Sequence, residues 1–196
     1  MKTIPKHRID ALTDGVYAIV MTILVLDINL PAQADYGSAA ELVAALGKLG
    51  HEFLAYAISF FVLAAFWRGE ASARGGPEEA SDRHAGWWIL RLFFITCVPI
   101  STSIVGSYGH LAPAVWLYAA NMILVTVPGL VMAELAPDES QLRRATRIRL
   151  GLLIVSALVS VAVSLAAPTI AMYAYLINAA APALTAWRDR ASAPAA

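Results

Sequence analysis

Polar and charged side chains cluster at the start of the first apolar segment of this chain. Arg8, Thr13 and Asp14 precede an apolar run that begins at Val16, and Thr22 places one hydroxyl within that run. A charge that enters a lipid-embedded helix is costly, so it must be paired or in contact with water. Thr13 is a candidate N-cap for a helix opening at Asp14, whose carboxylate would then face the positive end of the helix dipole. The residues alone leave both this structural role and a functional role open.

The same segment carries an apolar stripe at helical spacing. Ile19, Ile23 and Leu26 follow the i, i+4, i+7 pattern, and Thr22 falls on the same face beside the two isoleucines. A narrow stripe of this kind is what a helix offers to a symmetry axis, where it can line a pore. Ordinary packing between membrane helices uses the same spacing. Periodicity alone therefore predicts either a pore-lining face or a packing face.

No arrangement of residues typical of an enzyme or a metal site is found elsewhere. The four histidines, His7, His51, His84 and His110, lie outside the cores of the apolar segments and lack ligand spacing. The sequence contains no H-E-x-x-H motif, no glycine-rich phosphate loop and no nucleophile elbow. The single cysteine, Cys97, can form neither an intrachain disulfide nor a thiolate cluster. We therefore expect neither enzymatic activity nor a bound cofactor.

The elements that position these residues are predicted to be transmembrane helices. Of the 196 residues, 59% are hydrophobic and only 14% are charged, against about 25% charged in soluble domains. Mean hydropathy is +0.65. We expect one all-α membrane domain over residues 1–196, with kinks at Pro99 and Pro128. Its six predicted spanning helices are Val16–Leu30, Phe53–Trp67, Gly86–Tyr108, Val115–Leu135, Ile148–Ala167 and Thr169–Trp187.

The distribution of positive charge predicts that both termini are cytoplasmic. With six spans, the segments on the cytoplasmic side carry all but two of the 14 lysines and arginines, the exceptions being Lys48 and Arg91. A secretory signal cleaved after Ala32–Ala34 is an alternative, but it would leave an odd number of spans and remove this asymmetry. The formal net charge is zero, so no nucleic-acid partner is expected.

Several segments resemble a known channel family. Residues 8–22, RIDALTDGVYAIVMT, resemble the signature R-x-x-x-F-S-D-G-V-F-A-I-x-x-T of the prokaryotic relatives of transmembrane protein 175, the lysosomal potassium channel. Residues 24–28, LVLDI, match the L-x-L-(E/D)-I that follows it. Residues 56–60, YAISF, with Trp67 after them, are similar to the second-helix motif, and residues 99–102, PIST, to the third-helix motif P-x-S-T.

The resemblance implies a homotetramer in which the first helix of each subunit lines a central pore. Ile19, Ile23 and Leu26 would form the hydrophobic constriction, with Thr22 as a potassium-coordinating hydroxyl. The implied function is a potassium-selective channel, with the potassium ion as permeant ion, in a multi-pass protein of the prokaryotic plasma membrane. A proton or weakly selective cation channel on the same fold is the alternative, and a small secondary transporter is a third reading. Against the transporter stands the absence of an inverted repeat.

The family motifs also imply a polar network that joins the first three helices. This chain departs from the family at Leu12 and Thr13, which replace Phe and Ser, and at 68–70, where Arg-Gly-Glu stands in place of histidines. Arg91 stands where Asn is common, and a buried arginine needs a partner. We therefore expect Asp14 to pair with Arg91 or Arg8. The residues predicted to form this network are Arg8, Thr13, Asp14, Gly15, Trp67 and Arg91.

Overall fold

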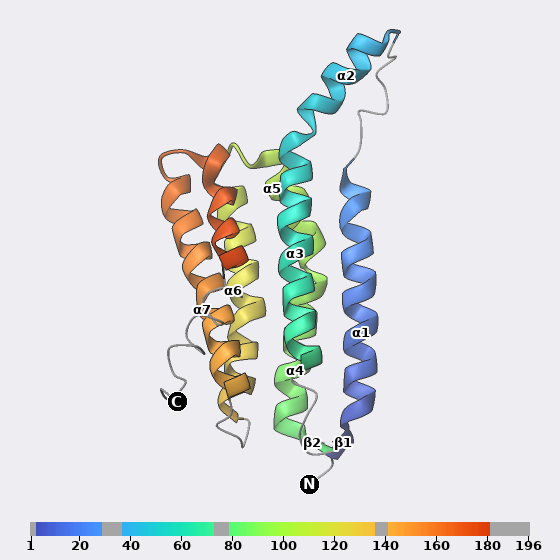
Figure 1. Ribbon diagram of the computed structural model, residues 1–196, viewed down its shortest axis with the longest axis vertical. Helices are drawn as coiled ribbons and strands as arrows, with labels where there is room; N and C mark the ends of the chain where they lie inside the picture. Colours follow the sequence, from blue (N-terminus) through green and yellow to red (C-terminus); the bar gives the residue numbers. More distant parts are fainter. Residues whose placement is uncertain (1–2, 29–36, 73–78, 136–140, 181–196) are drawn as a thin grey trace, which may run out of the picture.

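The computed structural model describes residues 3–28, 37–72, 79–135 and 141–180, and it is mostly helical (Figure 1). The long helices run roughly side by side. The elements, in chain order, are β1 (Thr3–Pro5), α1 (Lys6–Ile23), η1 (Leu24–Asp27), α2 (Ala39–Lys48), α3 (Gly50–Ser72), β2 (Glu79–Ser81), α4 (Asp82–Thr96), α5 (Val98–Tyr108), α6 (Ala112–Leu135), α7 (Gln141–Ser164) and η2 (Pro168–Ala180).

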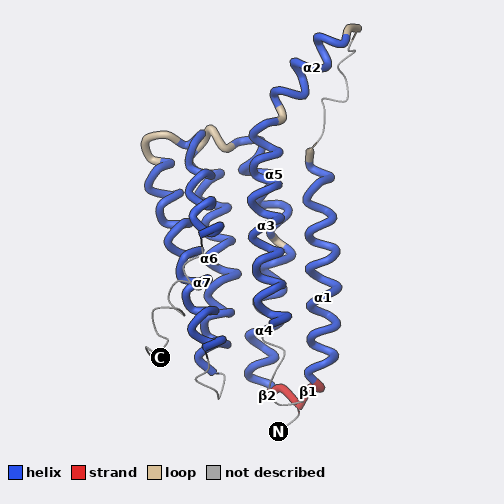
Figure 2. Tube along the Cα trace, in the orientation of Figure 1, coloured by secondary structure: helices blue, strands red, loops and turns tan. Residues whose placement is uncertain are grey.

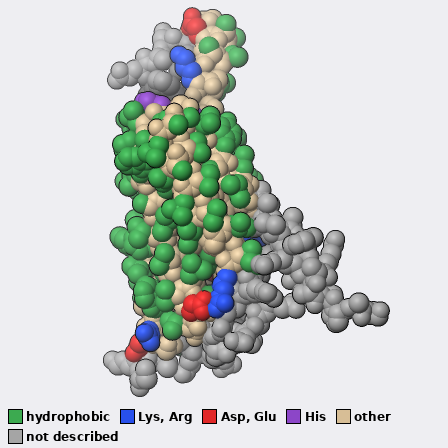
Figure 3. Space-filling model, turned by 90° about the vertical axis from the view of Figure 1, so that its left-hand side faces the viewer, with side chains coloured by type: hydrophobic (Ala, Val, Ile, Leu, Met, Phe, Trp, Pro, Cys, Tyr) green, Lys and Arg blue, Asp and Glu red, His purple; other side chains and the backbone are tan. Residues whose placement is uncertain are grey.

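Five helical segments among the described residues are long and apolar enough to cross a membrane. They are Lys6–Asp27, Gly50–Ala71, Asp82–Tyr108, Ala112–Leu135 and Thr146–Ser164, and each contains or overlaps one of the first five predicted spans. Hydrophobic side chains cover the face in Figure 3 along most of its length. The sixth predicted span coincides with η2 as far as Ala180, and its remainder lies outside the described residues. The presence of six membrane-spanning helices therefore remains a prediction.

The third span is interrupted near its middle. Helix α4 ends at Thr96, Cys97 lies between the two helices, and Pro99 occupies the first turn of α5. Proline has no amide hydrogen to donate to the preceding turn, so a helix interior is interrupted there whereas a first turn is not disturbed. The kink predicted at Pro99 is therefore a break between α4 and α5. Helix α6, in contrast, runs through Pro128 without ending.

A short two-stranded sheet adds to the mostly helical fold. Strands β1 and β2 pair antiparallel, with Thr3 opposite Ser81 and Pro5 opposite Glu79. Strands of three residues are too short to show an alternating pattern in the sequence. The pairing joins the chain just before α1 to the chain just before α4, at the end of the bundle where the N-terminus lies (Figure 2).

Helix α1 stands at the edge of the bundle, whereas α6 lies within it. The most apolar 18-residue window of the first span is only 22% buried, against 56% for α6. The core is formed mainly by α3, α5, α6 and α7, with Leu63, Val105, Met122 and Ala157 fully buried. Helix α1 adds Tyr17 and Val20 to this core from one side, and η1 adds Leu24. Most of its surface is therefore left for lipid or another protein chain.

Candidate ion pathway and supporting network

The predicted stripe of α1 lies on the uncovered side of that helix. The side chains of Ile19, Ile23 and Leu26 are 60%, 41% and 67% exposed. Gly15 lies at the start of the same stripe, and a Cβ atom placed on it would meet no atom within 4 Å. This face therefore points away from the rest of its own subunit, so it is open to a neighbouring subunit, a pore or lipid.

Thr22 presents its hydroxyl oxygen on this uncovered face. Its Oγ1 donates to the backbone of the preceding turn, with oxygen distances of 2.8 Å to the carbonyl of Ile19 and 3.0 Å to that of Ala18. Because the hydroxyl hydrogen is used by the helix backbone, the two lone pairs of Oγ1 are left to accept hydrogen bonds or coordinate a cation. The residue thus offers an acceptor rather than a donor to whatever lies beside α1.

The opposite face of α1 is held by two tryptophans. The buried hydroxyl of Thr13 donates to the carbonyl of Ile9 at 2.8 Å and accepts from Trp88 Nε1 at 2.7 Å. Trp67 Nε1 donates to Asp14 Oδ1 at 2.8 Å. Two adjacent motif residues thereby fasten α1 to both α3 and α4. The predicted N-cap role of Thr13 is wrong, because α1 begins about two turns earlier.

The structure also corrects the expected partner of Arg91. Its Nη1 lies 2.6 Å from Oε1 of Glu70 on α3, and the two side chains are only 8% and 13% exposed. The Asp14 carboxylate instead accepts from Trp67. Arg8 is exposed at the first turn of α1 and makes no ion pair with a described residue. The pairing of Asp14 with Arg91 or Arg8 is therefore replaced by a pair between α3 and α4.

Glu70 and Arg91 form the centre of a buried cluster that reaches α1. Tyr17 of α1 donates its hydroxyl to Glu70 Oε1 at 2.9 Å. The Arg91 guanidinium lies 5.1 Å from the centre of the Phe66 ring, within the range of a cation–π contact. On α6, Gly129 makes room for it, since a Cβ there would lie 3.1 Å from Arg91 Cζ. Four helices thus meet at one charge pair.

Sequence reasoning missed Glu70 as a member of this network. The signal was present, because Trp67 and Glu70 are three residues apart and so lie on the same side of α3. The three residues of this cluster that carry polar groups, Tyr17, Glu70 and Arg91, come from three different helices. The charge pair and the tyrosine hydroxyl thus supply the polar contacts at this place.

A second polar contact joins the motifs of the second and third spans. Thr102 Oγ1 on α5 donates to Ser59 Oγ on α3 at 2.8 Å, and Ser59 Oγ lies 2.9 Å from the hydroxyl of Tyr118 on α6. All three residues are buried. Hydrogen bonds of this kind satisfy polar groups that lipid cannot. The segments 56–60 and 99–102 therefore act here as packing contacts between helices.

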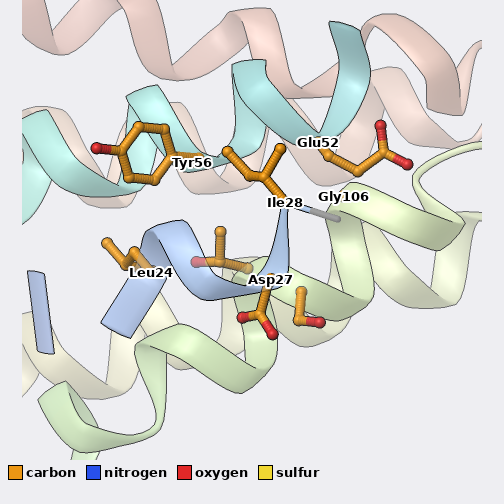
Figure 4. Close-up of a pocket in the computed structure, with 8 residues that line it drawn as sticks. Leu24, Asp27, Ile28, Glu52, Tyr56 and Gly106 are labelled. Atoms are coloured by element: carbon orange, nitrogen blue, oxygen red, sulfur yellow. The ribbon is translucent and has the colours of Figure 1, made fainter. Parts of the chain in front are cut away.

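A small pocket lies where η1, α3 and α5 meet (Figure 4), at the end of α1 away from the N-terminus. It has room for about one water molecule. The Asp27 and Glu52 carboxylates beside it point in different directions. Among the described residues, no group of three or more His, Cys, Asp or Glu side chains is placed to bind a metal. The lining residues are Leu24, Asp27, Ile28, Glu52, Tyr56, Thr102, Ser103 and Gly106.

Comparison with known proteins connects this geometry to one family. Residues 8–99 match the family described as endosomal/lysosomal potassium channel TMEM175. Every residue of the predicted stripe and network lies within that range. A crystal structure of a lysosomal potassium-selective channel TMEM175 homolog from Chamaesiphon minutus superimposes with a TM-score of 0.69 at 26% identity, covering 88% of this chain and 97% of that one.

Curated relatives carry two different activity names. The rat protein, named an endosomal/lysosomal proton channel, is 39% identical over 101 residues, 49% of this chain and 20% of its own length. Two bacterial relatives are named potassium channels. The Chryseobacterium protein is 26% identical over 67% of this chain and 60% of its own length, and the Streptomyces collinus protein is 30% identical over 56% and 54%. The matches thus span a fifth of the rat protein and just over half of the bacterial ones.

Proposed function

We propose that this chain, which is a homologue of the TMEM175 channels, assembles as a homotetramer and conducts potassium ions along its α1 helices. One observation carries the proposal. The apolar stripe with a single hydroxyl lies on the uncovered face of the least buried span, while the motif residues Thr13 and Asp14 fix the opposite face. A helix anchored on one side and exposed on the other is suited to line a central axis.

In the proposed pore, Ile19, Ile23 and Leu26 form apolar rings. Narrow apolar rings exclude water, and a cation must lose part of its hydration shell to pass, so they act as a gate that opens when the ring widens or becomes wet. The outward oxygen of Thr22, repeated four times around the axis, offers a site for a partly dehydrated potassium ion. No cofactor is needed for this mechanism, in which potassium is the permeant ion.

We further propose that the chain crosses a plasma membrane with both termini in the cytoplasm. The asymmetric distribution of lysine and arginine supports this orientation. The N-terminal end of α1 would then lie at the cytoplasmic mouth of the pore, and η1 at the outer mouth. The Glu70–Arg91 pair lies in the cytoplasmic half, where it holds α1 beside α3 and α4.

A proton or weakly selective cation channel is the second candidate. It is favoured by the rat relative, which is named a proton channel. The bacterial relatives, named potassium channels, favour the first candidate. Reversal potentials distinguish the two, because a potassium channel follows the potassium gradient whereas a proton pathway follows the pH gradient.

Flux through purified protein in liposomes tests the proposal directly. We expect potassium flux to exceed sodium flux. Leu26→Asn is expected to raise flux about tenfold, which corresponds to a barrier lowered by about 1.4 kcal/mol as a ring becomes wet. Ile23→Ala should also raise flux, since it widens a ring.

The matched control is Leu158→Asn, which changes a leucine of α7 that is 56% exposed, against 67% for Leu26. In Figure 1, α7 lies on the side of the bundle away from α1. If Leu26→Asn and Ile23→Ala leave flux unchanged, or if Leu158→Asn has the same effect, α1 does not line the pathway.

A further inference from the structure

One arginine outside the α1 network carries its charge between two spans. Arg149 lies in the fifth candidate span, near the N-terminal end of α7, and its side chain is half-buried. Its guanidinium lies against the last turns of α3 at Gly69, where a Cβ would be 2.9 Å from Nη1 and 3.2 Å from Cζ. The missing side chain at position 69 therefore lets a planar cation cover the backbone of α3.

Another arginine, Arg68, lies next to Gly69 on α3 and acts on Arg149 as a like charge. Within the part of the chain that the structure describes, Arg149 has neither an ion pair nor a hydrogen bond. Two residues earlier on α7, Arg147 instead pairs with Glu134 at the surface. Arg149 is thus a partly buried cation with no partner among the described residues, and such a cation calls for an anion.

We propose that Arg149 binds the phosphate group of an anionic lipid in the leaflet nearest the N-terminus. This arginine is near the end of an apolar span, the depth at which lipid headgroups lie. Basic sites between helices on the cytoplasmic side are suited to anionic headgroups. The planar guanidinium matches phosphate oxygens with two parallel hydrogen bonds. The inference depends on embedding in a membrane and not on ion conduction.

Native mass spectrometry of the purified protein with phosphatidylglycerol and phosphatidylcholine tests this site. Arg149→Gln is expected to weaken phosphatidylglycerol binding about fivefold, the loss of about 1 kcal/mol that one arginine near an anionic surface provides. Arg147→Gln is the matched control and should leave binding unchanged, because that arginine is already paired with Glu134. Phosphatidylcholine binding should be equal in all variants.

A second variant keeps the charge and moves it. Gly69→Ala would place a methyl group where the guanidinium lies, so we expect it to weaken phosphatidylglycerol binding in the same direction while the folded protein keeps all its arginines. If Arg149→Gln does not yield folded protein, Gly69→Ala alone tests whether Arg149 binds phosphatidylglycerol.

Three results would overturn the proposal. They are unchanged phosphatidylglycerol binding in both variants, equal weakening by Arg147→Gln, and protection against heat by inorganic phosphate in neutral-lipid nanodiscs that equals protection by phosphatidylglycerol. The last would identify free phosphate rather than a lipid as the ligand. Potassium flux does not enter this test, so its outcome is independent of the proposed channel function.

Discussion

At the residue scale, the Glu70–Arg91 pair shows how costly charges are accommodated inside a membrane bundle. Both side chains are almost fully buried, and the pair is completed by the Tyr17 hydroxyl and the Phe66 ring. Glu70 Oε2 and Arg91 Nε are buried without hydrogen-bond partners among the described residues. Part of the cost of removing these charges from water therefore persists, and the pair is expected to be sensitive to the loss of either member.

We predict that Glu70→Gln destabilises the protein by about 3–5 kcal/mol, because it leaves the buried Arg91 cation uncompensated. The double variant Glu70→Met with Arg91→Met is expected to cost less than Glu70→Gln alone, since neither residue then carries a charge. Thermal unfolding in detergent, followed by loss of monodisperse protein, measures both. Glu70→Met and Arg91→Met are also measured singly. If the loss of stability in the double variant equals the sum of the two single losses, the two residues are not coupled.

A second prediction at this scale concerns Gly129. Alanine there would place a Cβ 3.1 Å from Arg91 Cζ and 3.2 Å from Leu150 Cδ1, so the guanidinium, which is held by Glu70, must give by a few tenths of an ångström. We expect a loss of about 1–3 kcal/mol by overpacking. Gly151→Ala on α7 is the control, since its Cβ would meet nothing within 4 Å and alanine favours a helix. Equal melting temperatures for the two variants would show that Arg91 tolerates displacement.

At the element scale, α1 is a helix with two differently used faces. The face that carries Thr13, Asp14 and Tyr17 is fixed by side chains of α3 and α4, and the face that carries Ile19 and Leu26 is uncovered. The contacts on the fixed face lie in the first three turns of the helix. Among the described residues, the rest of α1 and the following η1 are held by apolar packing through residues such as Val20 and Leu24.

We predict that the indole of Trp88 couples α4 to α1 through Thr13. Trp88→Phe removes the donor of a 2.7 Å hydrogen bond, and Thr13→Val removes its acceptor while keeping the side-chain shape. Each change is expected to cost about 1 kcal/mol, and the pair of changes less than the sum. A double-mutant cycle on thermal stability gives the coupling. A coupling of zero would mean that the two residues are held by their surroundings alone.

The sequence anticipated the elements better than their contacts. Apolar length located five spans, and the helical period placed Ile19 and Leu26 on one face, because both depend on local composition. The partner of Arg91 could not be obtained this way, since Glu70 lies on another helix at a distance set by packing. The start of α1 was also missed. Its first two turns are polar, and they are supported by the β1–β2 pairing and by Trp67 and Trp88.

At the scale of the whole molecule, the single chain leaves its α1 helix incompletely covered. Hydrophobic side chains exposed along α1 need lipid or other subunits around them, and four copies arranged about an axis would bring the Thr22 hydroxyls together. The proposed channel function thus depends on an assembly in which one residue is used four times. In the proposed tetramer, a change at Thr22 would alter four groups in one ring, so the effect of a small chemical difference would be multiplied.

We therefore predict that Thr22→Val lowers the ratio of potassium to sodium flux, because four oxygen ligands are replaced by methyl groups of the same shape. Thr22→Ser keeps the oxygen and is expected to retain the ratio. Reversal potentials in opposed potassium and sodium gradients measure the ratio, and native mass spectrometry of each variant checks that the tetramer remains. If Thr22→Val leaves the ratio unchanged in an intact tetramer, the hydroxyl ring takes no part in selecting the ion. Discrimination would then arise from the spacing of the apolar rings at Ile19, Ile23 and Leu26.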